Sequence, residues 1–148
     1  TNENGKGGNV MEVDWIKPKT NWASTDKMNL EDYNRIKNNI LYLKEKANEV
    51  NKEFSIQNMG EDIVDYLELW DYEKFNLFEG NIEKINQSIF TQDIGIKKTF
   101  YPNGMFIKYD ELNRLEKACE KMKDIIERQT IGLRKIPFIL GRFKEVRI

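Results

Sequence analysis

The sequence predicts a mainly α-helical protein, a small bundle of amphipathic helices with short β segments. Two observations carry this prediction: apolar residues recur at steps of three and four, and a five-residue phrase occurs twice at an equivalent helical position. The β segments are expected at the N-terminus, in a central hairpin and in a C-terminal strand. A chain of 148 residues is long enough for one modest core or for two or three small helical units.

The clearest helix is predicted over residues 29–51. Asn29 precedes its apolar stripe and Asp32 follows three positions later, so each side chain can accept the other residue's backbone N–H in a capping box. The 3–4 spacing also suits packing against a second helix in the manner of a coiled coil. The stripe consists of Leu30, Tyr33, Ile36, Ile40, Leu43, Ala47 and Val50.

Three further helices are predicted from weaker patterns. A short one covers 60–73, another runs from Asn76, as its cap, to about residue 90, and a long one covers 109–129. Their apolar stripes are Ile63, Tyr66, Leu67 and Trp70; Leu77, Ile82, Ile85 and Ile89; and Leu112, Leu115, Cys119, Met122 and Ile126.

Three stretches have features of short β segments instead. Residues 10–20 alternate weakly between polar and apolar side chains. Residues 98–107 contain Pro102-Asn103-Gly104, a turn sequence that favours a hairpin. Residues 142–148 alternate after two helix-breaking residues, Pro137 and Gly141, so a terminal strand is expected there.

These elements divide the chain into three parts. Residues 1–20 are predicted to be a flexible arm and extended segment, 21–131 a helical domain, and 132–148 an extended or strand-like tail. The terminal strand is expected to add to a partner's sheet edge. Its expected contact residues are Phe138, Leu140, Phe143, Val146 and Ile148.

Composition excludes several functional classes. The chain has no histidine, and its single Cys119 falls on the apolar side of a helix without an evident activating base. A net charge of −1 implies neither an anionic nor a cationic partner, and no window is apolar enough to span a membrane. We therefore expect no enzyme activity, metal, cofactor, membrane or specific nucleic acid. Five cations are interpreted as a solvated or partner-paired face rather than a phosphate site: Arg134, Lys135, Arg142, Lys144 and Arg147.

An internal repeat is the most informative feature of the sequence. Asp32-Tyr33-Asn34-Arg35-Ile36 matches Glu111-Leu112-Asn113-Arg114-Leu115, which lies 79 positions later, and both fall in the opening turns of a predicted helix. The two copies extend over about 28–51 and 107–129. A partial third copy is placed at Phe75-Asn76-Leu77, in the register of Met28-Asn29-Leu30.

The asparagine and arginine of each copy are expected to have partners. Asparagine is unfavourable inside a helix, so its amide is expected to bind the backbone of an incoming loop, and arginine offers a planar fork of donors for carbonyls or a carboxylate. Two interpretations stay open: an anchor for a preceding loop or a neighbouring subunit, and polar residues that merely face solvent. The candidate docking residues are Trp22, Asn29, Asn34, Arg35, Asn76, Asn113 and Arg114.

The same residues resemble a known motif. The runs Pro18-Lys-Thr-Asn-Trp22, Thr25-Asp-Lys-Met-Asn29 and Glu31-Asp-Tyr-Asn-Arg-Ile-Lys-Asn-Asn-Ile40, followed by Tyr42-Leu43, are similar to tail and baseplate-region proteins of phages and prophages of low-GC Gram-positive bacteria. In that family Asp-x-Asn-Arg-Ile/Leu often occurs a second time, as Asp110-Glu-Leu-Asn-Arg-Leu115 does here. The resemblance covers about half of the chain. It implies a structural component of a virion or tailocin.

Three functional hypotheses follow. The first is an assembly component of a phage tail, baseplate or tailocin, made in the host cytoplasm and incorporated into the particle. It would dock to other phage structural proteins as a homo-oligomer or in many copies. The second is a soluble helical adaptor that binds one cytoplasmic partner. The third is a small tail-associated hydrolase, which would need two converging carboxylates that the sequence does not single out.

Overall fold

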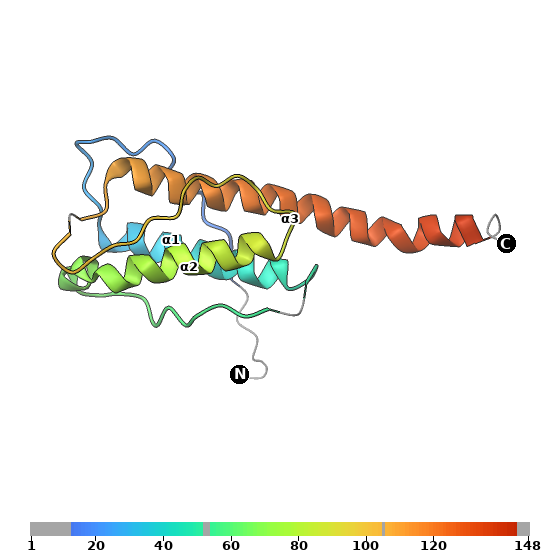
Figure 1. Ribbon diagram of the computed structural model, residues 1–148, viewed down its shortest axis with the longest axis horizontal. Coiled ribbons are helices and arrows are strands. Elements are labelled where there is room, and N and C mark those ends of the chain that lie inside the picture. Colours follow the sequence, from blue (N-terminus) through green and yellow to red (C-terminus); the bar gives the residue numbers. More distant parts are fainter. Residues whose placement is uncertain (1–12, 52–53, 105, 145–148) are drawn as a thin grey trace.

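The computed structural model describes residues 13–51, 54–104 and 106–144, and three parallel helices dominate it. Figure 1 shows the first turns of all three helices at one end of the molecule, so each helix runs in the same direction. The prediction of a mainly helical fold is confirmed. The elements are α1 (Leu30–Ala47), the short 3₁₀ helix η2 (Tyr66–Trp70), α2 (Tyr72–Gln87) and α3 (Tyr109–Lys144).

Helix α1 forms where the sequence pattern is strongest. The Oδ1 atom of Asn29 accepts the Asp32 N–H at 2.9 Å, and Asp32 Oδ2 accepts the Asn29 N–H at 2.9 Å, which is the predicted capping box. The helix ends at Ala47, and a turn over 48–50 follows. Its apolar stripe is buried, since Tyr33, Ile36, Ile40, Leu43 and Ala47 are at most 1% exposed.

The second and third predicted helices are wrong in their bounds. Most of 60–73 is not α-helical, because two aspartates cap separate short turns. Asp65 Oδ1 accepts the Leu67 N–H at 2.9 Å and starts η2, and Asp71 Oδ1 accepts the Glu73 N–H at 3.0 Å and starts α2. Asn76, the predicted cap, therefore lies one turn inside α2.

Helix α3 continues well past the predicted end at residue 129. The predicted strand over 142–148 is wrong where the structure describes it, because residues up to Lys144 are helical. A proline costs a helix one N–H donor and a local distortion, and here Pro137 and Gly141 do not end α3. Of the predicted strand contacts, Phe138, Leu140 and Phe143 lie on α3, whereas Val146 and Ile148 lie outside the described residues.

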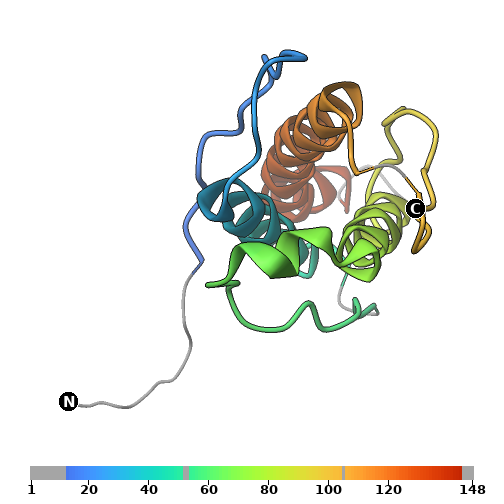
Figure 2. The ribbon, with the colours of Figure 1, turned by 90° about the vertical axis from the view of Figure 1, so that its left-hand side faces the viewer.

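Long connections run back along the outside of the bundle. We call them straps: strap 1 (13–29), strap 2 (48–51 and 54–65) and strap 3 (88–104 and 106–108), each of which precedes one helix. In the end-on view of Figure 2, the straps run along the outside of the three helices. Strap 1 includes the described part of the predicted N-terminal arm, and Trp15 there contacts Tyr42 of α1 with ring centroids 5.4 Å apart.

The straps replace the predicted β segments. Residues 13–20 and the described part of 98–107 contain no strand. At the predicted hairpin only the turn forms, with the Gly104 N–H donating to the Tyr101 carbonyl at 3.0 Å. The physical reason is that side chains of the helices, rather than neighbouring strands, form hydrogen bonds with the N–H and C=O groups of the straps.

Each helix contributes one buried apolar stripe to the core. The aromatic end of the core contains Tyr33, which stacks on Phe78 at 4.7 Å between ring centroids and meets Phe75 edge-on at 5.9 Å. The buried stripes are Tyr33, Ile36, Ile40, Leu43 and Ala47 on α1; Phe75, Phe78, Ile82 and Ile85 on α2, with Ile89 just beyond its end; and Leu112, Leu115, Cys119, Met122 and Ile126 on α3.

Candidate functional site: three asparagine clamps joined by ion pairs

On each helix, one asparagine at an equivalent position binds a residue of a strap. On α1, Asn34 accepts the Ile63 N–H at 3.0 Å and donates to the Ile63 carbonyl at 3.1 Å. One amide therefore satisfies both backbone groups of a single residue in strap 2, which fixes that residue in position and in orientation. We call this arrangement a clamp.

The clamp recurs on the other two helices. Asn76 of α2 accepts from the Phe100 N–H at 2.8 Å and donates to the Phe100 carbonyl at 2.9 Å. Asn113 of α3 does the same to Trp22 at 2.8 and 3.0 Å. Each helix thus holds the strap that precedes the next helix, and α3 closes the cycle by holding the strap of α1.

A second row of clamps joins two of the helices to their own straps. Asn39 of α1 binds both backbone groups of Ile16, at 3.0 and 2.7 Å. Asn81 of α2 binds both backbone groups of Gln57, each at 2.9 Å. The corresponding position of α3 is the buried Ala118, so strap 3 has no clamp of this kind at that position.

An ion pair ties α1 to α3 beneath strap 1. Arg35 donates two hydrogen bonds to the Glu116 carboxylate, from Nε at 2.9 Å and from Nη2 at 2.8 Å. Its Nη1 donates to Asp32 at 2.9 Å. Glu116 also accepts the Trp22 indole N–H at 2.7 Å and the Lys19 backbone N–H at 3.0 Å. Its side chain is 1% exposed, so four hydrogen bonds compensate the burial of one carboxylate.

An equivalent ion pair joins α3 to α2 beneath strap 3. Arg114 binds the carboxylate of Glu79, and its Nε donates to Glu111 at 2.9 Å. Glu79, whose side chain is 2% exposed, also accepts the backbone N–H of Lys98 at 3.3 Å. The acid, the arginine and the strap N–H thus take the same relative places as at the α1–α3 junction.

The α1–α2 junction departs from this plan. Leu77 of α2 stands where the other helices have arginine, and Lys37 of α1 stands where they have glutamate. Lys37 Nζ donates to the Gly60 carbonyl of strap 2 at 2.8 Å and pairs with Asp62 at 2.8 Å. A cation that donates to the strap carbonyl here replaces an anion that accepts from the strap N–H.

Burial and pairing perturb the charged groups of this network in opposite ways. Burial alone would lower the pKa of Arg35, but the hydrogen bonds and negative charge of Glu116, aided by Asp32, raise it overall. Burial raises the pKa of Glu79, and Arg114 and the Lys98 N–H only partly oppose that effect. Burial also raises the pKa of the Cys119 thiol, which keeps it protonated and disfavours a nucleophilic role.

All seven predicted docking residues take part in this network or in the cap beside it. Trp22, Asn34, Asn76 and Asn113 form the clamps, Arg35 and Arg114 form the ion pairs, and Asn29 caps α1. These asparagines bind the backbone of straps, but Asn34 and Asn76 hold straps that follow their own helices rather than the preceding loop that was expected. Docking of these residues to a neighbouring subunit stays a prediction.

Sequence reasoning missed the partners of these residues and misplaced the third copy. Glu116, Glu79 and Lys37 each follow a clamping asparagine by three positions, which was the available signal. The third copy was placed with Asn76 in the register of Asn29. The structure instead aligns Asn76 with Asn34, because both clamp a strap.

Comparison with known proteins gives no assignment. No protein-family model, no curated protein and no solved structure matches the chain. Within the described ranges, no helix is both long enough and apolar enough to cross a bilayer.

Proposed function

We propose that the chain is a structural assembly component of a phage tail, baseplate or tailocin that acts by docking to other proteins of the particle. The proposal comes from the sequence motif that resembles such proteins. One structural observation supports it: two residues that carry the resemblance, Trp22 and Arg35, meet at Glu116, beside the second-copy Asn113 that binds Trp22, whereas Asn34 separately binds strap 2.

That co-location is informative because the motif is made of common helix residues. Its tryptophan, its first-copy arginine and its second-copy asparagine nevertheless come together from segments far apart in the sequence. Trp22 is bound by Asn113 and Glu116, and Glu116 is bound by Arg35. The motif therefore encodes a connected structural unit that orders loops on a helical bundle, a suitable scaffold for presenting surfaces to neighbouring subunits.

The test is incorporation into particles. Particles would be purified on a density gradient from an induced culture of a strain that encodes the chain, and the chain would be quantified against a major tail protein by mass spectrometry. We expect a fixed ratio between the two proteins, and defective particles after deletion of the gene. Asn113→Ala should reduce incorporation, whereas Glu120→Ala, a change at an exposed position of α3, should not.

Intact, functional tails formed without the chain would refute the proposal. Recovery of the chain as a monomer bound one-to-one to a cytoplasmic protein would favour the adaptor hypothesis instead.

A further inference from the structure

The last turns of α3 extend beyond the bundle. Figure 1 shows this part of α3 running past the ends of α1 and α2 with no other helix beside it. In the bundle, the buried stripe of α3 passes through Leu115, Cys119, Met122 and Ile126. In the sequence, the same steps of three and four continue beyond Ile126 through Leu133, Ile136, Leu140 and Phe143.

This extension, which we define as residues 132–144, is strongly cationic. It contains four basic residues, Arg134, Lys135, Arg142 and Lys144, and no carboxylate. A short isolated amphipathic helix is marginal in water, so a helix here needs a covering partner. Side-by-side pairing of extensions from several copies would bring these like charges together, which disfavours such an arrangement.

The opposite end of the molecule has the complementary character. Residues 61–73, which we call the acidic end, contain six carboxylates and no basic residue. They also expose large apolar side chains: Val64 is 84% exposed, Leu67 75% and Trp70 68%. The carboxylates are Glu61, Asp62, Asp65, Glu68, Asp71 and Glu73.

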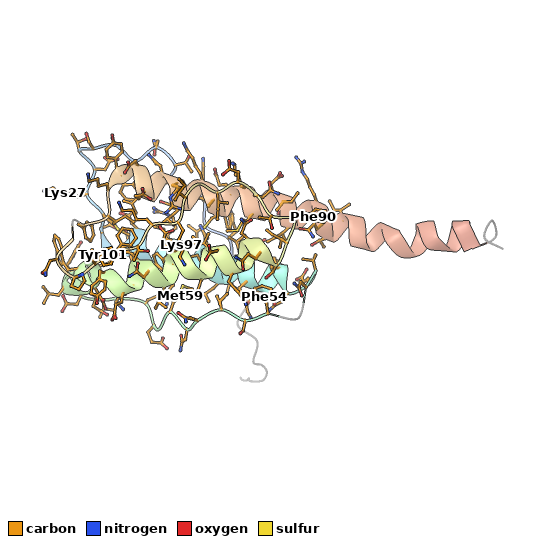
Figure 3. The ribbon with its side chains drawn as sticks, in the orientation of Figure 1. Lys27, Phe54, Met59, Phe90, Lys97 and Tyr101 are labelled. Atoms are coloured by element: carbon orange, nitrogen blue, oxygen red, sulfur yellow. The ribbon has the colours of Figure 1, made fainter. Side chains whose placement is uncertain are left out.

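A cavity opens beside this patch. Trp70 packs against Phe106 with ring centroids 4.9 Å apart, and the two rings line a cavity of about 190 Å³ together with Phe75, Phe100 and Tyr101. Tyr101 is 66% exposed and lies in Figure 3 at the end of the bundle where the helices begin. Exposed apolar surface around an apolar cavity marks an interaction site.

We propose that the chain assembles head to tail, with the extension of one copy docked on the acidic end of the next. The apolar stripe of the extension would cover Leu67, Trp70 and the cavity, and its cations would face the surrounding carboxylates. Because the two surfaces lie at opposite ends of one molecule, the contact is heterologous and generates a row or a closed ring rather than a symmetric dimer. This inference does not depend on the phage assignment.

Charge reversal at each end provides the test. One full-length variant carries Arg142→Glu and Lys144→Glu in the extension, and the other carries Glu61→Lys and Glu73→Lys at exposed positions of the acidic end. Mass would be measured by light scattering behind a sizing column over a concentration series. We expect the wild type to grow with concentration, and each variant alone to weaken association by about tenfold or more.

Mixing the two variants should restore association, because the glutamates introduced into the extension of one variant can then face the lysines introduced into the acidic end of the other, and the unchanged surfaces still pair as in the wild type. Raising the salt concentration should weaken the wild-type assembly. The control is Lys117→Glu with Glu120→Lys, a matched reversal at exposed positions of α3 within the bundle, which should behave like the wild type. Circular dichroism checks that every variant is folded.

Three results would overturn the proposal. A wild type that stays monomeric at every concentration would do so. So would normal assembly of the Glu61→Lys, Glu73→Lys variant, which would point to contact between extensions. Failure of the folded variants to complement each other would also exclude this docking.

Discussion

The α1–α3 junction and the α1–α2 junction use equivalent positions with different chemistry. At the first, Arg35 and Glu116 form a buried bidentate pair; at the second, Leu77 and Lys37 occupy the corresponding places. Arginine and its acidic partner are thus both absent from the same junction, as expected if either alone would leave an unpaired buried charge. The asparagine clamp, by contrast, is present at all three junctions.

The comparison separates two roles. The clamps position the straps in every unit, because extended backbone against a helix always needs its N–H and C=O groups satisfied. The ion pairs join particular helices, and a junction without one stays closed by apolar contact and a lysine bonded to a strap carbonyl.

The largest loss is expected for Glu116→Ala. The change leaves Arg35 without its main partner, and it leaves the Trp22 indole N–H and the Lys19 backbone N–H without an acceptor. The free energy of unfolding should therefore fall by about 3–5 kcal/mol. Urea denaturation followed by circular dichroism measures it. Glu120→Ala, at an exposed position one turn further along α3, is the control. A loss no larger than that of the control would show that the pair is dispensable.

Alanine at each clamp should destabilise the protein to a similar extent. Asn34→Ala, Asn76→Ala and Asn113→Ala each leave one strap N–H and one carbonyl without their partner, at a cost of about 1–3 kcal/mol. The same denaturation experiment applies, with Gln87→Ala, at the exposed last residue of α2, as control. Strongly unequal losses would contradict the equivalence of the three clamps.

The missing ion pair can be installed at the α1–α2 junction. Lys37→Glu alone should destabilise, because it removes the bonds to Gly60 and Asp62, and Leu77→Arg alone should place a partly buried cation without a carboxylate. Together they should recover stability, with a coupling energy of about 0.5–3 kcal/mol in a double-mutant cycle. Additive losses would mean that the junctions are not geometrically equivalent.

The smallest effect concerns pH. Burial raises the folded-state pKa of Glu79 above its ordinary value of 4.5, so the proton stabilises the fold below that value, and this contribution is lost as the pH rises through the folded-state pKa. Relative to the wild type, Glu79→Gln should therefore gain stability as the pH increases from about 4 to about 7. Urea denaturation at several pH values checks the trend, with Glu120→Gln as control. An opposite slope would mean that pairing with Arg114 outweighs burial.

Features that depend on neighbouring residues, such as helix caps and apolar stripes, could be predicted from the sequence. The cap and the apolar stripe of α1 lie within a few residues of one another, so the sequence located that helix well. The start of α2 was misplaced because Asp71 and Asn76 both suit a cap, and only the packing of the bundle selects Asp71. The sequence pattern predicted that the last helix ends near residue 129, because Pro137 and Gly141 usually break helices. In the structure they do not end α3.

The straps and the ion pairs could not be predicted in the same way. Asn113 was recognised as an anchor, but its partner Trp22 lies 91 residues away, and nothing local identifies it. The repeat could have supplied the missing information. Had Asn76 been aligned with Asn34, the glutamates that follow Asn76 and Asn113 by three positions would have stood out as partners for arginine.

The closed cycle of clamps also bears on how the chain folds. Two clamps join residues 29 and 24 positions apart, but the third joins Trp22 to Asn113 across 91 positions. Closing so long a loop carries a large entropic cost before its contacts form, which slows folding. During synthesis, the backbone N–H groups of Lys19 and Trp22 have no partner until Asn113 and Glu116 have been made. The bundle is therefore expected to fold as one cooperative unit, once these residues are present, rather than helix by helix.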